Sequence, residues 1–396
     1  MLHVLFRRFV AVTTMLVSVS AFADATRYSD SGPEPLLANT LAAIDQGDFA
    51  GAMKQIDTLI AAYPNFRLAH LIRGDLLLAQ TRPLSTFGEG GKGSHDKIAD
   101  LQDEAVARLQ AWHDKTPSVA LPRNLVQMES SQRYAIVVDS KKSRLYLYRN
   151  DSGTPRFVAD YYITQGKLGA EKVSEGDMRT PIGVYHVTSS LSPKKLGDFY
   201  GSGAYPINYP NDWDRRMGRK GHGIWLHGTP SNTFSRPPHA SEGCVVLANR
   251  DLDAISADLQ IGLTPVIISE SIEWLSTDDW QAERNSLLGT LDAWRQDWES
   301  RDTDKYAAHY SRGFRADGVN ASKWIEQKRK VNAGKSWIKV TARNVSMFVN
   351  PGKEEYVVVT FEQDYRSNNL NSVSRKRQYW IKEDGRWKII SEGNTG

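Results

Sequence analysis

One cysteine and one histidine have the types and the spacing that covalent catalysis needs. Cys244 is the only cysteine of the 396-residue chain, and His227 lies 17 positions (244 − 227) before it. A thiol is an effective nucleophile when a neighbouring base gives it thiolate character, and a histidine can supply that base and later protonate a leaving amine. One cysteine excludes an internal disulfide and a cysteine-rich zinc site. Three interpretations of Cys244 stay open here: an inert buried thiol, an intermolecular disulfide partner or a reactive nucleophile.

The residue before the cysteine favours the reactive interpretation. Gly243 allows a tight backbone turn that would direct the amides of Gly243 and Cys244 at a developing oxyanion. The chemistry of the pair alone does not decide between a catalytic cysteine and a cysteine of the core.

The surrounding segments resemble the catalytic motif of the L,D-transpeptidases (the YkuD-type catalytic domain), in which a histidine precedes a Ser-His-Gly-Cys box. Here the box reads Ser241-Glu242-Gly243-Cys244. Further segments follow the order of the family. They are the Gly-Asp-x-x-Thr-Pro motif at 176–185, the strand that delivers the histidine at 223–228, and the closing helix and strand at 249–252 and 262–268.

The resemblance implies acyl transfer on the stem peptides of peptidoglycan, without metal or cofactor. Cys244 would attack the carbonyl of the meso-diaminopimelate L-centre that precedes the terminal D-alanine. His227 would move the protons, and the thioester on Cys244 would pass to an amine or to water. The carbonyl of Gly228 would orient the histidine, and Ser241 would support the loop. No paired ligand spacing among the histidines points to a metal.

Two positions depart from the family pattern. Glu242 stands where the box has histidine, and Val246 stands where an arginine is common. Both changes bear on substrate binding. The Ser-x-Gly-Cys-Val form resembles a branch with Gram-negative cell-shape enzymes, some of which hydrolyse the bond. L,D-transpeptidation, L,D-carboxypeptidation and an inactive wall-binding scaffold therefore stay open.

Four residues near these motifs are candidates for substrate contact. Arg179 is either a contact to a stem-peptide carboxylate or an exposed loop charge. His222 is either a substrate contact or structural, and His239 either replaces the box histidine or is a solvated loop residue. Glu242 is the fourth candidate. The acceptor amine would belong to a second stem peptide, an outer-membrane lipoprotein or another cell-wall protein.

The first residues have the features of a secretory signal peptide. Arg7 and Arg8 precede an apolar run at 9–19, and Ala21-Phe22-Ala23 is typical of a cleavage site. An uncleaved anchor is the alternative, but the run is shorter than the roughly 20 residues of a membrane span. We therefore expect removal of 1–23, no membrane span afterwards, and a location in the periplasm of a Gram-negative bacterium. A net charge of +4 without a basic arm argues against nucleic-acid binding.

The patterning predicts an α+β protein of several domains. A composition of 40% hydrophobic and 24% charged residues excludes disordered, collagen-like and coiled-coil classes. Residues 24–125 read as helical and tetratricopeptide-like, either a plain hairpin or a partner-binding module. Residues 131–270 are mostly β. Residues 277–396 resemble the NTF2-like cone fold through Leu291, Trp294, Trp298 and the segment 384–390, which implies an accessory binding or positioning domain.

Overall fold

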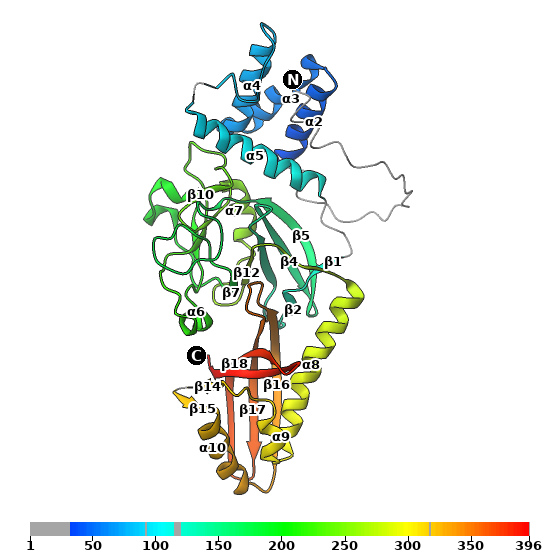
Figure 1. Cartoon of the computed structure of the whole chain (residues 1–396), viewed down its shortest axis with the longest axis vertical. Coiled ribbons are helices and arrows are strands. Elements are labelled where there is room, and N and C mark those ends of the chain that lie inside the picture. The colour runs from blue at the N-terminus through cyan, green and yellow to red at the C-terminus, as the bar shows by residue number, and fades with distance from the viewer. Residues whose placement is uncertain (1–31, 92, 115–119, 317, 396) are drawn as a thin grey trace.

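A computed structural model describes residues 32–91, 93–114, 120–316 and 318–395, so the predicted signal peptide lies outside the described residues. The described part confirms the predicted α+β class. Figure 1 shows a helical region, a central mixed domain and a C-terminal sheet with helices, arranged in that order along the long axis of the molecule.

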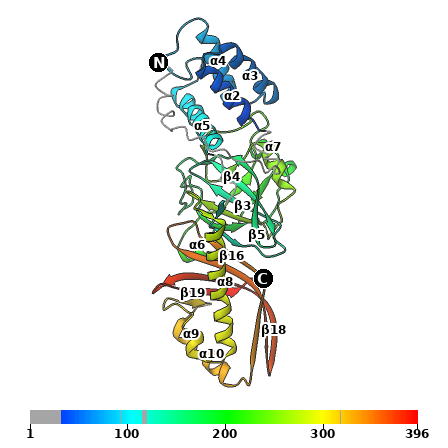
Figure 2. The same ribbon diagram turned by 90° about the vertical axis from the view of Figure 1, so that its right-hand side faces the viewer.

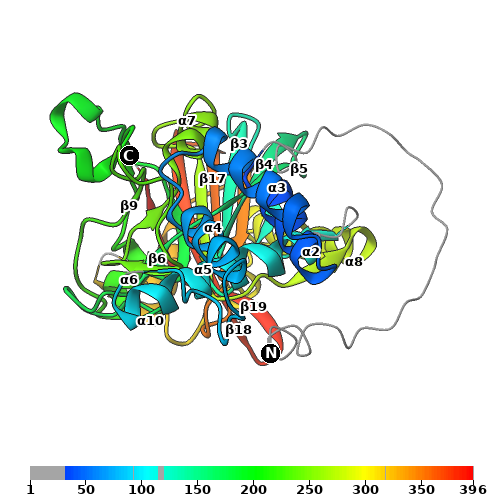
Figure 3. The same cartoon turned by 90° about the horizontal axis from the view of Figure 1, so that it is seen from above.

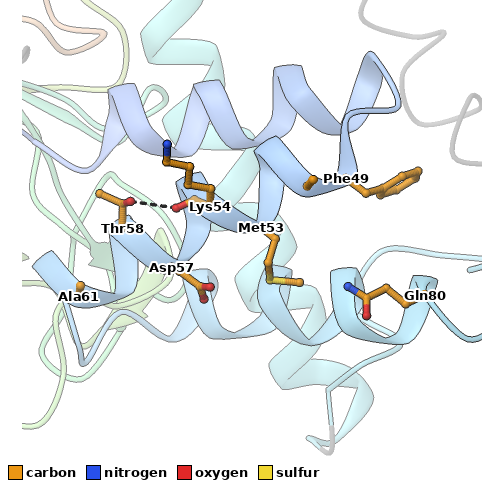
Figure 4. A pocket seen from close by; sticks show the side chains of 8 residues that line it. Phe49, Met53, Lys54, Asp57, Thr58, Ala61 and Gln80 are labelled. Carbon is orange, nitrogen blue, oxygen red and sulfur yellow. Dashed lines mark hydrogen bonds between the residues drawn. The ribbon is translucent and has the colours of Figure 1, made fainter.

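Within residues 32–114 as the structure describes them, the N-terminal region consists of the helices α2 (Glu34–Asp45), α3 (Phe49–Ala62), α4 (Arg67–Ala79) and α5 (His95–His113). Asp48 caps α3 by accepting a hydrogen bond from the amide of Gly51. One apolar core joins the helices, with Leu37, Ile56, Phe66 and Ile72 fully buried. A groove on the outer side of α3 is lined by Phe49, Met53, Lys54, Asp57, Thr58 and Gln80 among others (Figure 4).

A five-stranded sheet in the order β5-β4-β3-β12-β7 is the centre of the middle domain. Its inner strands β3 and β12 and the first half of β4 are mostly apolar and buried, as in a sheet covered on both faces, whereas the edge strand β5 is partly exposed. Two small sheets, β11-β9-β8 and β10-β6, lie beside it. They carry His227 and Ser241, and Cys244 directly precedes β11. The strands of this domain are β3 (Tyr134–Asp139), β4 (Arg144–Asp151), β5 (Thr154–Tyr162), β6 (Gln165–Gly166), β7 (Gly183–His186), β8 (Ala204–Pro206), β9 (Trp225–His227), β10 (His239–Ser241), β11 (Val245–Val246) and β12 (Pro265–Ser269). Its helices are α6 (Asp212–Arg216), α7 (Asn249–Ser256) and the short 3-10 turns η2 (Pro193–Lys195) and η3 (Asp198–Tyr200).

The C-terminal domain curls long antiparallel strands around a 23-residue helix, α8 (Thr277–Glu299), which runs along the sheet in Figure 2. Trp280, Trp294 and Trp298 of this helix and Trp380 of the sheet are buried, whereas Trp337 is exposed. Most tryptophans thus fill the core or pack against it. The remaining elements are α9 (Thr303–Ala307), α10 (Ala321–Ala333), β14 (Arg315–Ala316), β15 (Val319–Asn320), β16 (Ile338–Val349), β17 (Tyr356–Ser367), β18 (Leu370–Glu383) and β19 (Arg386–Asn394).

The segment before the central domain joins it to the C-terminal domain. The described helices of the N-terminal region end at His113, before the boundary at 125 expected from the sequence. Strand β1 (Ala120–Pro122) pairs with β13 (Trp274–Ser276), and β2 (Leu125–Gln127) adds a strand to the C-terminal sheet next to β16. Trp213 also stacks on Tyr356 with ring centroids 4.1 Å apart. The two domains therefore share a packed interface.

The helical region packs on the opposite end of the central domain through buried charges. Arg108 of α5 pairs with Glu34 of α2 at 2.6 Å, and its guanidinium carbon lies 3.9 Å from the Tyr162 ring centre. Arg144 of β4 reaches the same Glu34 carboxylate at 3.6 Å from the other side of the interface. Seen from this end, α2 to α5 lie over the central domain (Figure 3). Because a buried charge without a partner is energetically costly, these ion pairs fix the orientation of the helical region on the central domain.

Candidate active site

Parallel pairing of two short strands brings the cysteine and the histidine together. In the register of β9 and β11, Val245 lies opposite Leu226 and Val246 opposite His227. Cys244, one residue earlier, therefore falls opposite Trp225. Side chains alternate between the faces of a sheet, so Cys244 and His227 extend from the same face, diagonally related.

The ring of His227 is held in one orientation. Its side chain is buried, and Nδ1 lies 2.7 Å from the carbonyl oxygen of Gly228. A carbonyl oxygen can only accept, so Nδ1 carries the proton and Nε2 is the basic nitrogen. The contact expected from the sequence between Gly228 and His227 is thus present.

Both reacting groups are neutral near pH 7 in this environment. Burial lowers the pKa of His227 to about 4, with the Gly228 hydrogen bond opposing the shift and the charge of Arg236 adding to it. Burial raises the pKa of the Cys244 thiol to about 11, against the amide of Trp225 and the charge of Arg236. The thiol donates to the carbonyl oxygen of Gly223 at 3.4 Å. Deprotonation must therefore accompany nucleophilic attack, with Nε2 as the base.

Ser241 shapes the loop that carries the cysteine. Its hydroxyl donates to the Cys244 carbonyl at 2.6 Å and accepts the Gly243 amide at 3.1 Å. The loop support expected of Ser241 is therefore visible in its contacts. The Gly243 amide donates its hydrogen to Ser241 in this structure. The oxyanion roles of the Gly243 and Cys244 amides stay predictions.

A threonine that the sequence analysis did not single out braces the same loop. The buried hydroxyl of Thr180 donates to the Gly243 carbonyl at 3.0 Å and accepts the Gly166 amide at 3.0 Å. Its place in the Gly-Asp-x-x-Thr-Pro motif was the signal that could have found it.

Asn249, at the start of α7, holds the turn after the histidine. Its side-chain oxygen accepts the amides of Thr229 at 3.1 Å and Ser202 at 2.9 Å, and its Nδ2 donates to the Thr229 carbonyl at 2.8 Å. The carbonyl of Gly228 that orients His227 directly precedes this clamp.

Comparison with known proteins agrees with this geometry. Residues 133–268 match the family of the L,D-transpeptidase catalytic domain. The central domain is an L,D-transpeptidase catalytic domain. Residues 286–393 match the Cds6 C-terminal NTF2-like domain, which confirms the predicted nature of the C-terminal part. No curated protein matches the chain by sequence.

Solved structures share the arrangement of domains. Bd1075 from Bdellovibrio bacteriovorus is 28% identical with a TM-score of 0.63, over 70% of this chain and 98% of Bd1075. The helical cell shape determining protein Pgp2 from Campylobacter jejuni is 24% identical with a TM-score of 0.57, over 72% of this chain and 99% of Pgp2. The likeness to Pgp2 shows a common fold.

The four predicted substrate contacts of the L,D-transpeptidase domain lie around the box in different settings. Arg179 is half-buried, and its Nη1 donates to the Ala170 carbonyl at 2.9 Å. His222 is exposed, with Nε2 3.3 Å from Glu175. His239 and Glu242 are exposed on either side of Ser241. No hydrogen bond between described residues joins His239 to Cys244 or His227. The substrate roles of all four stay predictions.

Aromatic residues and one arginine complete the wall beside the histidine. The His227 ring centre lies 5.2 Å from that of Tyr200 and 6.1 Å from that of Phe199. The guanidinium carbon of Arg236 lies 4.4 Å from the Phe199 ring centre. No motif singled out these residues, because two separate segments, one between β7 and β8 and one between β9 and β10, bring them to the site.

Two further observations concern metal binding and membrane spans. In the described ranges, no cluster of three or more histidine, cysteine or acidic side chains could hold a metal ion. None of the helices described is both long and apolar enough to cross a bilayer.

Proposed function

We propose that this protein is an exported, peptidoglycan-modifying cysteine enzyme that releases D-alanine from tetrapeptide stems. The observation that carries the proposal is the pairing of β9 with β11, which sets a thiol and an oriented imidazole on one face. The L,D-transpeptidase domain and the signal-peptide pattern support a periplasmic site of action.

The reaction follows from the protonation states. As the Cys244 sulfur bonds to the carbonyl of the diaminopimelate L-centre, its proton passes to Nε2 of His227. The tetrahedral oxyanion is held by backbone N–H groups, the carbon–nitrogen bond breaks, and the imidazolium protonates the departing amine of D-alanine. A thioester is left on Cys244. Attack by an acceptor amine, whose proton goes to His227, forms the new peptide bond and restores the thiol.

Hydrolysis of the same thioester is the second candidate. It needs only water and trims tetrapeptides to tripeptides. The exposed carboxylate of Glu242, directly beside Gly243 and Cys244, favours it, since a carboxylate can hold a water molecule there. In either case the NTF2-like domain binds or positions the wall polymer and takes no part in the chemistry.

Incubation of the mature protein with purified disaccharide tetrapeptides tests the proposal. Loss of D-alanine with dimer formation supports transpeptidation, and loss of D-alanine with tripeptides alone supports the carboxypeptidase. Cys244→Ala should abolish both products, and Arg156→Gln, an exposed change on β5, should abolish neither. An unchanged substrate with the wild-type protein favours the scaffold and refutes the proposal.

A further inference from the structure

Arg236 is a half-buried arginine beside the reacting groups that has no anionic partner. In the described part of the chain no carboxylate lies within ion-pair distance of its guanidinium, and Nη2 donates to the Phe199 carbonyl at 3.2 Å. Arginine is seldom desolvated without a counter-charge. Such a group in an active site points to an anion that arrives with the substrate.

Both ends of Arg236 are fixed in space. Its carbonyl accepts the hydroxyls of Tyr162 at 3.0 Å and Thr164 at 2.9 Å. Thr164 exchanges two backbone hydrogen bonds of 2.9 Å with Val246, which lies opposite His227 in the strand pairing. The guanidinium lies over the Phe199 ring, which in turn neighbours the rings of Tyr200 and His227. The positive charge is therefore held against the aromatic wall of the site, one ring away from the histidine.

Other cations near the box are already engaged. Lys172 is buried, with Nζ 2.7 Å from an Asp177 carboxylate oxygen and 2.9 Å from the Ser174 carbonyl. Arg179 donates to Ala170. The charge of Arg236 acts on both Cys244 and His227, whereas none from Arg179 ranks among the leading influences on either.

The proposed substrate carries a carboxylate at the right place. In a peptide that ends one residue after the scissile bond, the terminal carboxyl carbon is only three bonds from the attacked carbonyl carbon. An anion this close to the thiol comes within reach of the Arg236 guanidinium, the cation near Cys244 and His227 that has no anionic partner among the described residues. A guanidinium binds a carboxylate through two parallel hydrogen bonds, which gives both affinity and direction.

We propose that Arg236 binds the free C-terminal carboxylate of the stem peptide and thereby selects peptides that end one residue after the scissile bond. This inference rests on the proposed function. Arg236 would then supply, from a different loop, the positive charge that an arginine at position 246 provides in the family pattern. This chain has valine at that position.

The helical region holds the loop that carries Arg236. The Phe234 ring centre lies 4.7 Å from that of Tyr63 and 5.0 Å from that of Phe66. The Phe234 amide donates to the Asn65 carbonyl at 3.1 Å, and the Ser235 hydroxyl donates to Glu104 at 2.6 Å. Contacts with the helical region, which lies outside the catalytic domain, thus fix the position of the Arg236 loop.

The test compares a tetrapeptide stem that ends in D-alanine with the same peptide that ends in D-alaninamide. Wild-type enzyme should prefer the acid by about 10–100-fold in kcat/KM, mainly through KM. Arg236→Gln should remove the preference by slowing the acid alone, and Arg236→Lys should keep part of it. Arg156→Gln is the matched control, and thermal unfolding shows whether each variant is folded.

Three results would overturn the inference. An active wild-type enzyme that treats acid and amide alike refutes it and leaves the proposed function standing. An equal loss on both peptides in Arg236→Gln assigns the arginine to thiol activation or structure. Loss of preference in Arg179→Gln and not in Arg236→Gln assigns the carboxylate to Arg179. A wild-type enzyme inert on both peptides refutes the proposed function itself.

Discussion

Gly243 faces the backbone carbonyl of Arg179 so closely that a Cβ at position 243 would lie 2.7 Å from that oxygen. The glycine also has φ +128°, a conformation that side chains with a Cβ rarely adopt. The box therefore accepts only glycine immediately before the nucleophile, for two separate reasons.

We expect Gly243→Ala to lower kcat by about a hundredfold, because displacement of Cys244 by an ångström misaligns the attack. Gly262→Ala is the control. Gly262 also has positive φ, +78°, but its Cβ would meet nothing within 4 Å. Steady-state kinetics of both variants, at equal folded fraction, measure the effect. Equal loss in the two variants would mean that strain alone matters and that the contact with Arg179 does not.

Thr180→Val should destabilise the fold and the active loop together. Valine keeps the shape but leaves the Gly243 carbonyl and the Gly166 amide without their partner, and each buried unsatisfied group costs about 1–3 kcal/mol. Urea unfolding should show the loss, and activity should fall with it. Thr188→Val, which removes an exposed hydroxyl bonded to the Pro206 carbonyl at 3.1 Å, should change stability by less than about 0.5 kcal/mol. A neutral Thr180→Val would contradict the bracing role.

The pH dependence of thiol reactivity tests the neutral state of the pair. Since the pKa of Cys244 is raised to about 11, the thiolate fraction at pH 7 is very small. The rate of alkylation by iodoacetamide should therefore rise about tenfold per pH unit from pH 7 to pH 10. The same protein unfolded in urea is the control and should level off near its ordinary pKa of about 8.5. A folded-state plateau below pH 7 would indicate a thiolate–imidazolium pair.

Phe234→Ala tests whether the helical region acts on the site. Removal of the ring takes away the contacts with Tyr63 and Phe66 that hold the Arg236 loop. We expect kcat/KM on the acid peptide to fall about tenfold, the loss typical of a displaced positioning contact. The alkylation rate of Cys244 at a fixed pH should change little, because β9 and β11 do not depend on this contact. Leu77→Ala, at an exposed position of α4, is the control and should leave kcat/KM unchanged. Unchanged kinetics in Phe234→Ala would mean that the helical region does not influence the active site.

Residue types and spacing pointed to the cysteine and the histidine, and the resemblance to the L,D-transpeptidases implied the Gly228 contact and the support from Ser241. The residues that make these contacts lie within short segments of the chain. Ser241 belongs to this group, since its bonds reach only two and three residues along the chain. The donation of the Gly243 amide to Ser241 was not predicted, because the direction of one serine hydroxyl, not the chain path, decides which acceptor the amide meets.

Distant contacts explain what the sequence did not predict. Arg236 reaches the site because Phe234 and Ser235 dock on helices more than a hundred residues earlier in the chain. Strand β2 joins the C-terminal sheet although only three residues long, too short for a periodic pattern. The α+β class was predictable because long strands and helices repeat their pattern over many residues. The NTF2-like part was predictable through the resemblance carried by Leu291, Trp294, Trp298 and the segment 384–390.

Capture of the acyl-enzyme tests the central claim most directly. Wild-type protein is mixed with a tetrapeptide stem, quenched in acid within seconds, and digested for mass spectrometry. The account predicts that the peptide containing Cys244 gains the mass of the stem without its terminal D-alanine. Free D-alanine should appear in equal amount in the first turnover, and Cys244→Ser should give no thioester. Release of D-alanine by Cys244→Ala, or a wild-type protein that releases D-alanine with the acyl group on another residue, would contradict it.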